Sequence, residues 1–303
     1  MPSSVVTRVP GKINLQLSVG PLQRDGYHPV ATVFQAVSIF DDVKIALSDK
    51  SGITIHSAKS DERLPLDKNN LAFKAAELMA KKFDITDGIE ITLNKEIPIA
   101  GGMAGGSADA AGVIVGLDSL FELGLSRDEM EVLGSNLGAD VPFSICGGVA
   151  IGTGRGDQIT PALFKGSYNW VLALSGQGLA TPSVYAECDR LREGLSISTP
   201  VVSEQLMQAL RAGDAKALGK SLSNDLQPAA CSLRPALRLV LDVGLDYGAL
   251  GGIVSGSGPT VAFLVKDDEH AMDLTVALSS SGVISSVVRA TGAVAGARII
   301  ESF

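Results

Sequence analysis

A glycine-rich segment in the first half of the chain has the composition of a phosphate-binding loop. It reads GGMAGGS over residues 101–107 and lies between an alternating, strand-like segment and a strongly helical one. Glycine lets the backbone bend tightly and approach a ligand closely. A helix begins with unpaired N–H groups and a partial positive charge, so a loop that leads into one can bind a phosphate. The composition alone fits a plain flexible turn equally well.

Two common phosphate-loop patterns do not fit this segment. The pattern GxxxxGK[ST] needs a lysine immediately before Ser107, and the chain has none there. The glycines also do not follow the spacing GxGxxG of a dinucleotide-binding fold. The segment therefore predicts an anion site that is neither a P-loop nor a dinucleotide fingerprint.

Two charged residues are of the types that phosphoryl transfer requires. Asp140 occurs among small and apolar residues in the run GADVPF, and its carboxylate could accept the proton of a hydroxyl. Lys12 follows a Pro-Gly pair, and a lysine beside an aspartate keeps that carboxylate ionised. Spacing alone fits an ordinary surface lysine and an aspartate at a helix end equally well.

Hydrophobic periodicity predicts the elements that would position these residues. Residues 12–19 alternate between polar and apolar, which predicts a half-buried strand with Lys12 and Asn14 on its polar face. A helix is expected over residues 70–83, and another follows the glycine-rich loop. The pattern restarts near residue 160, where we expect a boundary between two parts of the chain.

Two further signals mark the ends of helices. Ser126 and Glu129 have the spacing of a capping box, which predicts a helix that starts there. A helical pattern over residues 203–222 is interrupted at Gly213, so we expect it to be broken there.

The composition excludes several classes of function. The chain has 303 residues, 46% of them hydrophobic, and can bury a large core. Its net charge is −8 and it has no long run of lysine or arginine, which argues against nucleic acid or an anionic membrane as a partner. No apolar run is long enough to span a membrane. Three scattered cysteines without a CxxC pattern, and a start without room for a leader peptide, predict reduced thiols in the cytoplasm.

Three motifs, taken in their order along the chain, resemble those of the GHMP superfamily of small-molecule kinases. They are PGKINL at residues 10–15, the segment 98–111, and GGIVSGSGPT at residues 251–260. The resemblance implies a two-domain α+β fold, with an ATP-binding domain over residues 1–160, a C-terminal domain over residues 161–303 and the active site in the cleft between them. It also implies phosphoryl transfer from ATP, together with Mg²⁺, to the hydroxyl of a small metabolite.

Shorter segments resemble one branch of that superfamily. They are RDGYH at residues 24–28, GADVPF at 138–143, TPSVY at 181–185 and NDL at 224–226. This branch phosphorylates the 2-hydroxyl of a cytidine diphosphate derivative of methylerythritol, on the methylerythritol phosphate route to isoprenoids. Two alternatives remain: a GHMP kinase for another alcohol, such as homoserine or a mevalonate intermediate, and a nucleotide-binding regulator without chemistry. Retention of both Lys12 and Asp140 argues against the regulator.

The resemblance also implies roles for individual residues. Asp140 would be the catalytic base and Lys12 its cationic neighbour. The substrate would be bound by Asn14, Tyr27, His28 and Tyr185, the last three at its cytosine end. For Tyr185, a place in the core of its own helix fits the sequence nearly as well as stacking on the base.

The other residues to which the resemblance assigns a role would bind ATP. Asn70 would lie near the adenine, and the phosphates would be cradled by Pro98, Gly101, Gly102, Met103, Ala104, Gly105, Gly106, Ser107 and Ala108. The chain departs from the family pattern in this loop, because Ala104 stands where glycine is frequent and Ala108-Asp109 where Ser-Asn is common. The methyl group of Ala104 narrows the approach of a phosphate, and Ala108 lacks a hydroxyl that could contact one.

Overall fold

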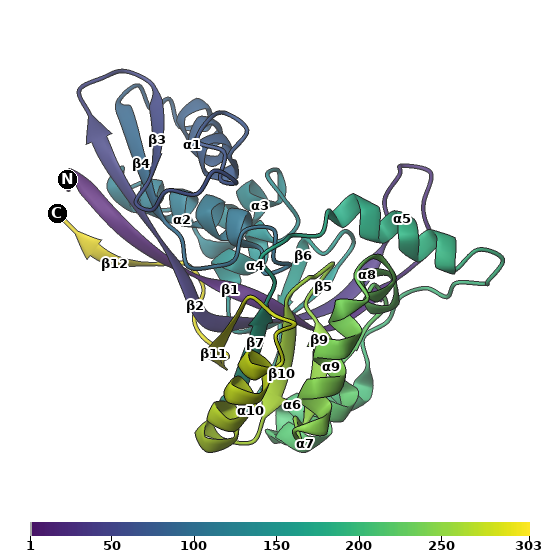
Figure 1. Cartoon of the computed structure of the whole chain (residues 1–303). Coiled ribbons are helices and arrows are strands. Elements are labelled where there is room, and N and C mark those ends of the chain that lie inside the picture. Colours follow the sequence, from purple (N-terminus) through teal and green to yellow (C-terminus); the bar gives the residue numbers. More distant parts are fainter. Residues whose placement is uncertain (1) are drawn as a thin grey trace.

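Two long antiparallel strands run through the middle of the molecule (Figure 1). They are β1 (Ser4–Val19) and β2 (Val30–Ser48). The structure, a computed structural model, describes residues 2–303. The pairing of the two strands shifts register once between Pro10 and Gly11 and again between Asn14 and Gln16. Such irregularities redirect side chains and are frequent beside functional sites, and here they flank Lys12 and Asn14.

The other strands extend this pair into one sheet with two sections. They are β3 (Ile53–Ser57), β4 (Gly88–Asn94), β5 (Val149–Thr153), β6 (Gln158–Pro161), β7 (Tyr168–Leu174), β8 (Ser223–Asn224), β9 (Gly251–Val254), β10 (Val261–Val265), β11 (Ser286–Gly292) and β12 (Arg298–Ser302). The order along the sheet is β12-β1-β2-β11-β7-β10-β9. Because only the pair Gly292–Val37 joins β11 to β2, the sheet is continuous but narrow at that point.

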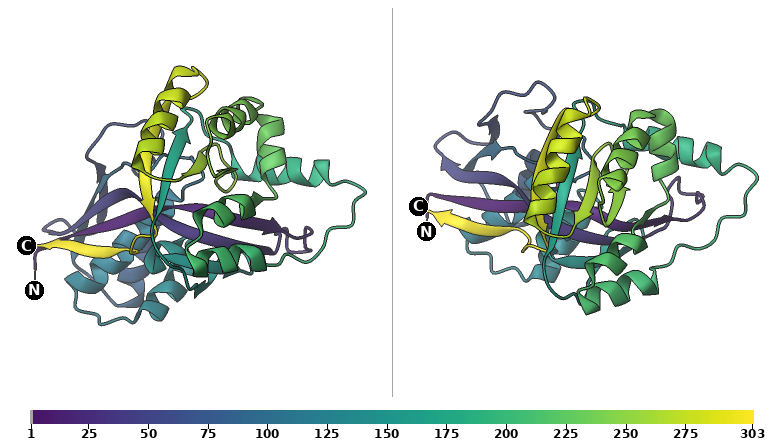
Figure 2. Two further views of the ribbon diagram at one scale, coloured as in Figure 1. Left: turned by 90° about the horizontal axis from the view of Figure 1, so that it is seen from below. Right: turned by 60° about the horizontal axis from the view of Figure 1, so that its bottom comes forward.

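Helices cover both sections of the sheet (Figure 2). They are α1 (Leu71–Lys82), α2 (Gly105–Leu120), α3 (Arg127–Ser135), α4 (Val141–Cys146), α5 (Thr181–Leu191), α6 (Glu204–Ala212), α7 (Ala215–Ser221), α8 (Gln227–Leu233), α9 (Ala236–Asp246) and α10 (Asp268–Ser280). Among residues 2–303, no helix combines the length and the apolar character needed to cross a bilayer.

The expected helix ends are confirmed. Asn70 caps α1, Ser126 and Glu129 form the reciprocal hydrogen bonds of a capping box at α3, and Gly213 ends α6 in a left-handed conformation. The α+β class is also confirmed. The boundary near residue 160 stays a prediction, and the last strand, β12, pairs with β1 in the N-terminal section.

The prediction of a half-buried first strand was wrong, because β1 is buried on both faces. Lys12, Asn14 and Gln16 are 5%, 2% and 4% exposed. One reason is that Gln16 donates to the Val201 carbonyl at 2.7 Å and accepts from the Ser203 amide at 2.8 Å. The C-terminal half therefore covers the polar face of the strand. Alternation identifies a polar face, but it does not say whether that face meets water or the interior of the protein.

Candidate active site

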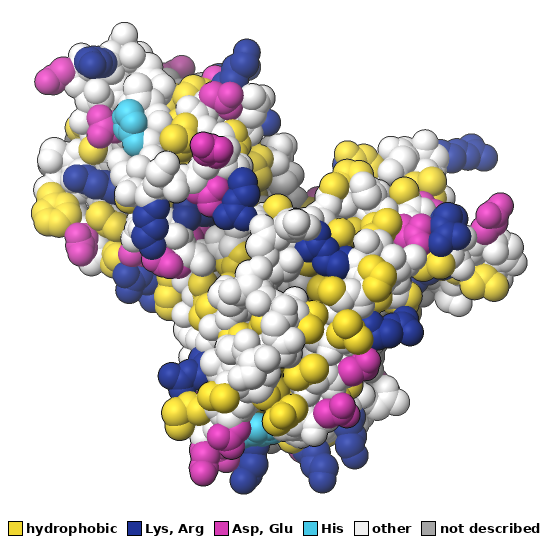
Figure 3. Space-filling view, in the orientation of Figure 1, with side chains coloured by type: hydrophobic (Ala, Val, Ile, Leu, Met, Phe, Trp, Pro, Cys, Tyr) yellow, Lys and Arg dark blue, Asp and Glu magenta, His cyan; other side chains and the backbone are white. Residues whose placement is uncertain are grey.

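A cavity of about 880 Å³ lies between the glycine-rich loop, the C-terminal half of β1, the N-terminal half of β2, and helix α5. The space-filling view shows the molecule hollowed between the part that carries α1 and α3 and the arm that carries α5 (Figure 3). Among the predicted site residues, the cavity is lined by Lys12, Asn14, Tyr27, His28, Pro98, Gly101, Gly102, Ala104, Gly105, Gly106, Asp140 and Tyr185. The structure thus brings both ends of the predicted site into one space.

The three motifs meet at the glycine-rich loop. In the first motif, the Lys12 amide donates to the Met103 carbonyl at 3.2 Å. In the third motif, the Ser255 hydroxyl donates to the Gly102 carbonyl at 3.0 Å and the Thr260 amide donates to the Gly101 carbonyl at 3.2 Å. The loop carbonyls are therefore occupied by protein donors, which leaves the amide groups at the start of α2 for an anion.

Helix α2 begins in an unusual backbone conformation. Ala104 precedes its first residue with φ 61° and ψ 32°, the left-handed region that glycine adopts most easily. An L-residue with a Cβ is disfavoured there by about 1–2 kcal/mol. Ala104 therefore adds both local strain and a methyl group at the wall of the cavity.

A buried charged cluster supports the same helix start, and we call Asp41, Lys95 and Asp109 the loop triad. The Lys95 ammonium donates to Asp41, to Asp109 Oδ2 at 2.6 Å and to the Gly105 carbonyl at 3.0 Å. Asp41 also accepts from two consecutive backbone amides after β4. The triad therefore fixes the first residue of α2 to the end of β4 through side chains that are almost fully buried.

Burial sets the protonation of this triad. It raises the pKa of Asp109 to about 7, and the neighbouring carboxylate of Asp41 adds to the rise while Lys95 opposes it. Burial alone would lower the pKa of Lys95, but the charges of Asp109 and Asp41 outweigh that effect and the pKa is raised. Lys95 therefore stays positively charged, and Asp109 can exchange a proton near neutral pH.

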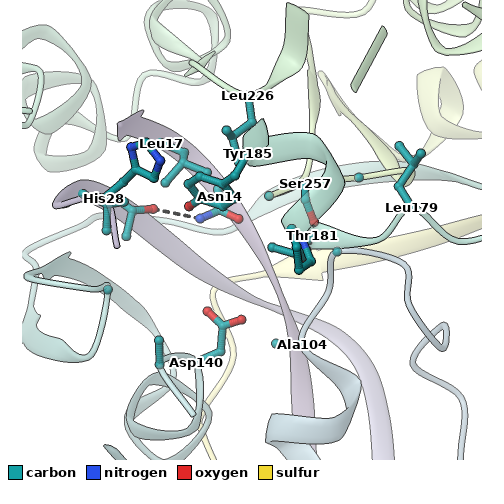
Figure 4. Close-up of a pocket in the computed structure, with 18 of the residues that line it drawn as sticks. Asn14, Leu17, His28, Ala104, Asp140, Leu179, Thr181, Tyr185, Leu226 and Ser257 are labelled. Atoms are coloured by element: carbon teal, nitrogen blue, oxygen red, sulfur yellow. Dashed lines mark hydrogen bonds between the residues drawn. The ribbon is translucent and has the colours of Figure 1, made fainter. Parts of the chain in front are cut away.

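Lys12 and Asn14 form a hydrogen-bonded row on the floor of the cavity. Lys12 donates to Asn14 Oδ1 at 2.7 Å, Asn14 donates to the Thr32 hydroxyl at 2.8 Å, and Thr32 donates to the Gln16 carbonyl at 2.6 Å. This row fixes the orientation of the Asn14 amide (Figure 4). Burial lowers the pKa of the Lys12 ammonium, and the charge of Asp140 opposes the shift. A negatively charged ligand in the cavity would favour the protonated form further.

Asp140 lies across the cavity from Asn14, immediately before the short helix α4. Its side chain makes no capping hydrogen bond with that helix, and its carboxylate points into the cavity toward Asn14 and Tyr185 (Figure 4). Its carbonyl, in contrast, accepts the amide and hydroxyl of Ser144 at 3.1 Å. The backbone is thus tied to α4 while the carboxylate is left for a ligand.

Aromatic rings line the end of the cavity opposite the glycine-rich loop. The rings of His28 and Tyr185 lie with centroids 5.2 Å apart. The His28 ring is held at both nitrogens, with Nδ1 2.9 Å from the Gly20 carbonyl and Nε2 3.3 Å from Asp189. Burial, followed by the charge of Asp140, raises the pKa of Tyr185 to about 12, so its hydroxyl remains a hydrogen-bond donor. Tyr27 is 53% exposed and completes this wall.

Helix α5 presents one face to the cavity. Thr181, Tyr185 and Asp189 recur every four residues, and all three line the cavity. The hydroxyl of Thr181 lies 2.9 Å from that of Ser257 in the third motif, which joins the start of α5 to the loop beyond β9. Sequence reasoning missed Thr181 and Asp189 as site residues, although their spacing from Tyr185 was a usable signal.

Four of the residues predicted to bind ATP do not line the cavity. Asn70 is buried and uses its side chain as the cap of α1, accepting from the Ala72 amide and donating to the Pro65 carbonyl. Met103 and Ala108 have fully buried side chains. Ser107 is partly exposed on the first turn of α2. Contacts of Met103 and Ala108 with ATP would therefore have to use backbone atoms.

Comparison with known protein families gives two matches along the chain. Residues 70–148 match the model of the GHMP kinases N terminal domain, and residues 206–284 match that of the GHMP kinases C terminal domain. The first contains the glycine-rich loop and Asp140, and the second contains the third motif.

Relatives match over nearly the whole chain. A 4-diphosphocytidyl-2-C-methyl-D-erythritol kinase of Leifsonia xyli subsp. xyli is 50% identical, and the match covers 98% of this chain and 99% of the relative. An enzyme of the same name from Mycolicibacterium smegmatis is 48% identical, with 99% and 93% covered. The chain therefore belongs to the GHMP kinase family, in the branch that these relatives form.

Solved structures agree with this assignment. A crystal structure of a 4-(cytidine 5'-diphospho)-2C-methyl-D-erythritol kinase superposes with a TM-score of 0.78 at 29% identity, covering 95% of this chain and 99% of the other. The mevalonate kinase of L. major in complex with R-mevalonate gives a TM-score of 0.75 at 17% identity, covering 96% and 98%. The second likeness shows the shared fold only.

Proposed function

We propose that this protein transfers the γ-phosphoryl group of ATP to the 2-hydroxyl of 4-diphosphocytidyl-2-C-methyl-D-erythritol, giving the 2-phosphate and ADP. The reaction is a step of the methylerythritol phosphate route of isoprenoid biosynthesis. Relatives of that name match over nearly the full length of both chains, which supports the assignment. The single structural observation behind it is one cavity with the glycine-rich loop at one end, aromatic rings at the other and Asp140 facing the space between.

The glycine-rich end would bind the phosphates of ATP. The first amides of α2 lack partners within the helix, and the glycines leave room for phosphate oxygens to approach them. Lys12 adds a positive charge at the floor of the cavity. Mg²⁺ in kinases is bound by phosphate oxygens of the nucleotide together with protein side chains, so it would enter with ATP and offset charge on the transferring group.

Asp140 would act on the acceptor hydroxyl. As the 2-hydroxyl oxygen forms a bond to the γ-phosphorus, the bond from that phosphorus to the bridging oxygen breaks and ADP leaves. The hydroxyl proton passes to the Asp140 carboxylate. This carboxylate makes no capping hydrogen bond with α4, so it is available to a ligand in the cavity. The ammonium of Lys12, oriented by Asn14, would offset the charge that develops as the proton moves.

The aromatic end would bind the cytosine. Tyr27 and Tyr185 offer ring faces for stacking, and every nucleobase presents a π-face of its own. His28 has both ring nitrogens engaged by Gly20 and Asp189, so its edge is presented in a fixed orientation. The three cysteines are free and buried, which fits a reducing cytoplasm as the place of action.

The test is ADP release measured with ATP, Mg²⁺ and a panel of acceptors. Turnover with 4-diphosphocytidyl-2-C-methyl-D-erythritol, at a kcat/KM at least a hundredfold above that for homoserine or mevalonate, is expected. The margin of about a hundredfold or more reflects the loss of all contacts at the aromatic end for an acceptor without a base. Turnover of homoserine or mevalonate alone would keep the kinase chemistry and reject this substrate.

A further inference from the structure

Arg155 touches the exposed loop that carries Tyr27. It lies in the turn between β5 and β6 and lines the same cavity. Its guanidinium carbon is 3.7 Å from the centroid of the Tyr27 ring, which is a close cation–π contact. A guanidinium nitrogen also lies 3.1 Å from Asp25 Oδ2. One side chain therefore contacts both the ring and the turn that presents it.

Asp25 links these two contacts. Its Oδ1 accepts the Tyr27 amide at 3.1 Å while its Oδ2 accepts Arg155. The Tyr27 backbone, the Asp25 carboxylate and the guanidinium thus form a closed set of contacts around the ring. The hydrogen bond from the Tyr27 amide, and after it the one from Arg155, lowers the pKa of Asp25, so the carboxylate is charged at neutral pH.

The turn that carries Arg155 is itself well anchored. The Arg155 amide donates to Asp157 Oδ1 at 3.2 Å, and the Gly154 carbonyl accepts the Val30 amide at 2.9 Å. Val30 begins β2, directly after the loop that holds Tyr27. The turn is therefore fixed to the strand that follows the loop, whereas Tyr27 itself is half exposed.

We propose that Arg155 is a positioning residue for pyrimidine nucleotide recognition, holding the Tyr27 ring in the orientation in which it stacks on the cytosine of the acceptor substrate. The inference rests on the proposed function, because it concerns the same acceptor. A ring that is already oriented loses less conformational freedom when the base binds, so its contact contributes more to affinity. The glycine-rich loop lies at the other end of the cavity, so substitution of Arg155 should leave ATP binding unchanged.

The test is steady-state kinetics of Arg155→Met with both substrates varied. The KM for 4-diphosphocytidyl-2-C-methyl-D-erythritol should rise about tenfold, which corresponds to about 1.4 kcal/mol. The kcat and the KM for ATP should stay within about twofold, because phosphoryl transfer takes place away from this residue. Arg155→Lys keeps the charge without the planar guanidinium and should recover only part of the loss.

A matched control and a double variant separate positioning from other effects. Arg8 makes the same kinds of contact, over the Phe40 ring at 5.6 Å and to Asp42 at 2.8 Å, but does not line the cavity. Arg8→Met should leave both KM values unchanged. In the Tyr27→Leu background, Arg155→Met should change the acceptor KM by less than about twofold, because the ring it positions is gone.

Three results would overturn the inference. An unchanged acceptor KM in Arg155→Met would show that the arginine does not matter for recognition. A tenfold effect that persists in Tyr27→Leu would show that it acts on the substrate directly, and parallel losses in both KM values and kcat would indicate a general structural role. If the wild-type protein does not use this acceptor at all, the proposed function fails first and the inference falls with it.

Discussion

At the glycine-rich end of the cavity the loop is held by buried groups, whereas at the aromatic end the binding loop is held by exposed ones. The loop triad is at most 9% exposed and its Lys95 donates to the first residue of α2, while the first and third motifs donate hydrogen bonds to the loop carbonyls. Arg155 and Asp25, in contrast, are about half exposed. ATP would thus bind to a loop whose position is already fixed. The acceptor substrate would bind to a loop with fewer buried supports, which its own binding would order further.

The largest expected effect comes from removing a buried support of the glycine-rich loop. Lys95→Met leaves two carboxylates buried together without their cation, and the loss of one partner of a buried ion pair destabilises by about 3–5 kcal/mol. The free energy of unfolding in urea should fall by that amount. Lys59 pairs with Glu96 on the surface, so Lys59→Met should lower it by less than about 1 kcal/mol. Equal losses in the two variants would show that the buried pairs of Lys95 support the protein no more than a surface pair does.

At the aromatic end, Tyr185→Leu should weaken binding of the acceptor substrate and leave ATP binding unchanged. Stacking on a nucleobase is worth about 1–3 kcal/mol, so the acceptor KM should rise by about tenfold to a hundredfold while the KM for ATP stays the same. Tyr247 is 61% exposed outside the cavity, and Tyr247→Leu serves as the control. A rise in both KM values would mean that the two ends do not act independently.

A pH dependence of stability sharpens the account of the rigid end. The pKa of Asp109 is about 7 in the folded protein and about 4 for an ordinary unfolded carboxyl group. Between these values the folded state holds a proton that the unfolded state releases, so stability falls as the pH rises. The melting temperature of Asp109→Asn should therefore decline less than that of the wild type between pH 4 and 7. Parallel curves would contradict the raised pKa.

The sequence predicted local features and the order of the motifs well. The helix start at residue 70, the cap at Ser126, the break at Gly213 and the helix after the glycine-rich loop all depend on residues close in the chain. Their physical causes are local hydrogen bonds and backbone preferences, which a short window of sequence contains.

The supports of the site could not be predicted in the same way. Lys95 is 54 residues from Asp41, and the two meet because β2 and β4 pair at Asp42 and Asn94. Arg155 is 130 residues from Asp25, and no local pattern marks it. The buried polar face of β1 depends on a segment near residue 202 that covers it. Each of these features follows from tertiary pairing, which periodicity does not encode.

The measurement that tests the central claim most directly compares the wild type with Asp140→Asn, for both turnover and acceptor binding. If Asp140 is the base between the two ends, kcat should fall by about 10²–10⁴. The dissociation constant of the acceptor, measured by calorimetry without ATP, should change by less than about threefold, because both binding ends stay intact. A variant with near wild-type kcat would show that Asp140 is not the base and would contradict the account.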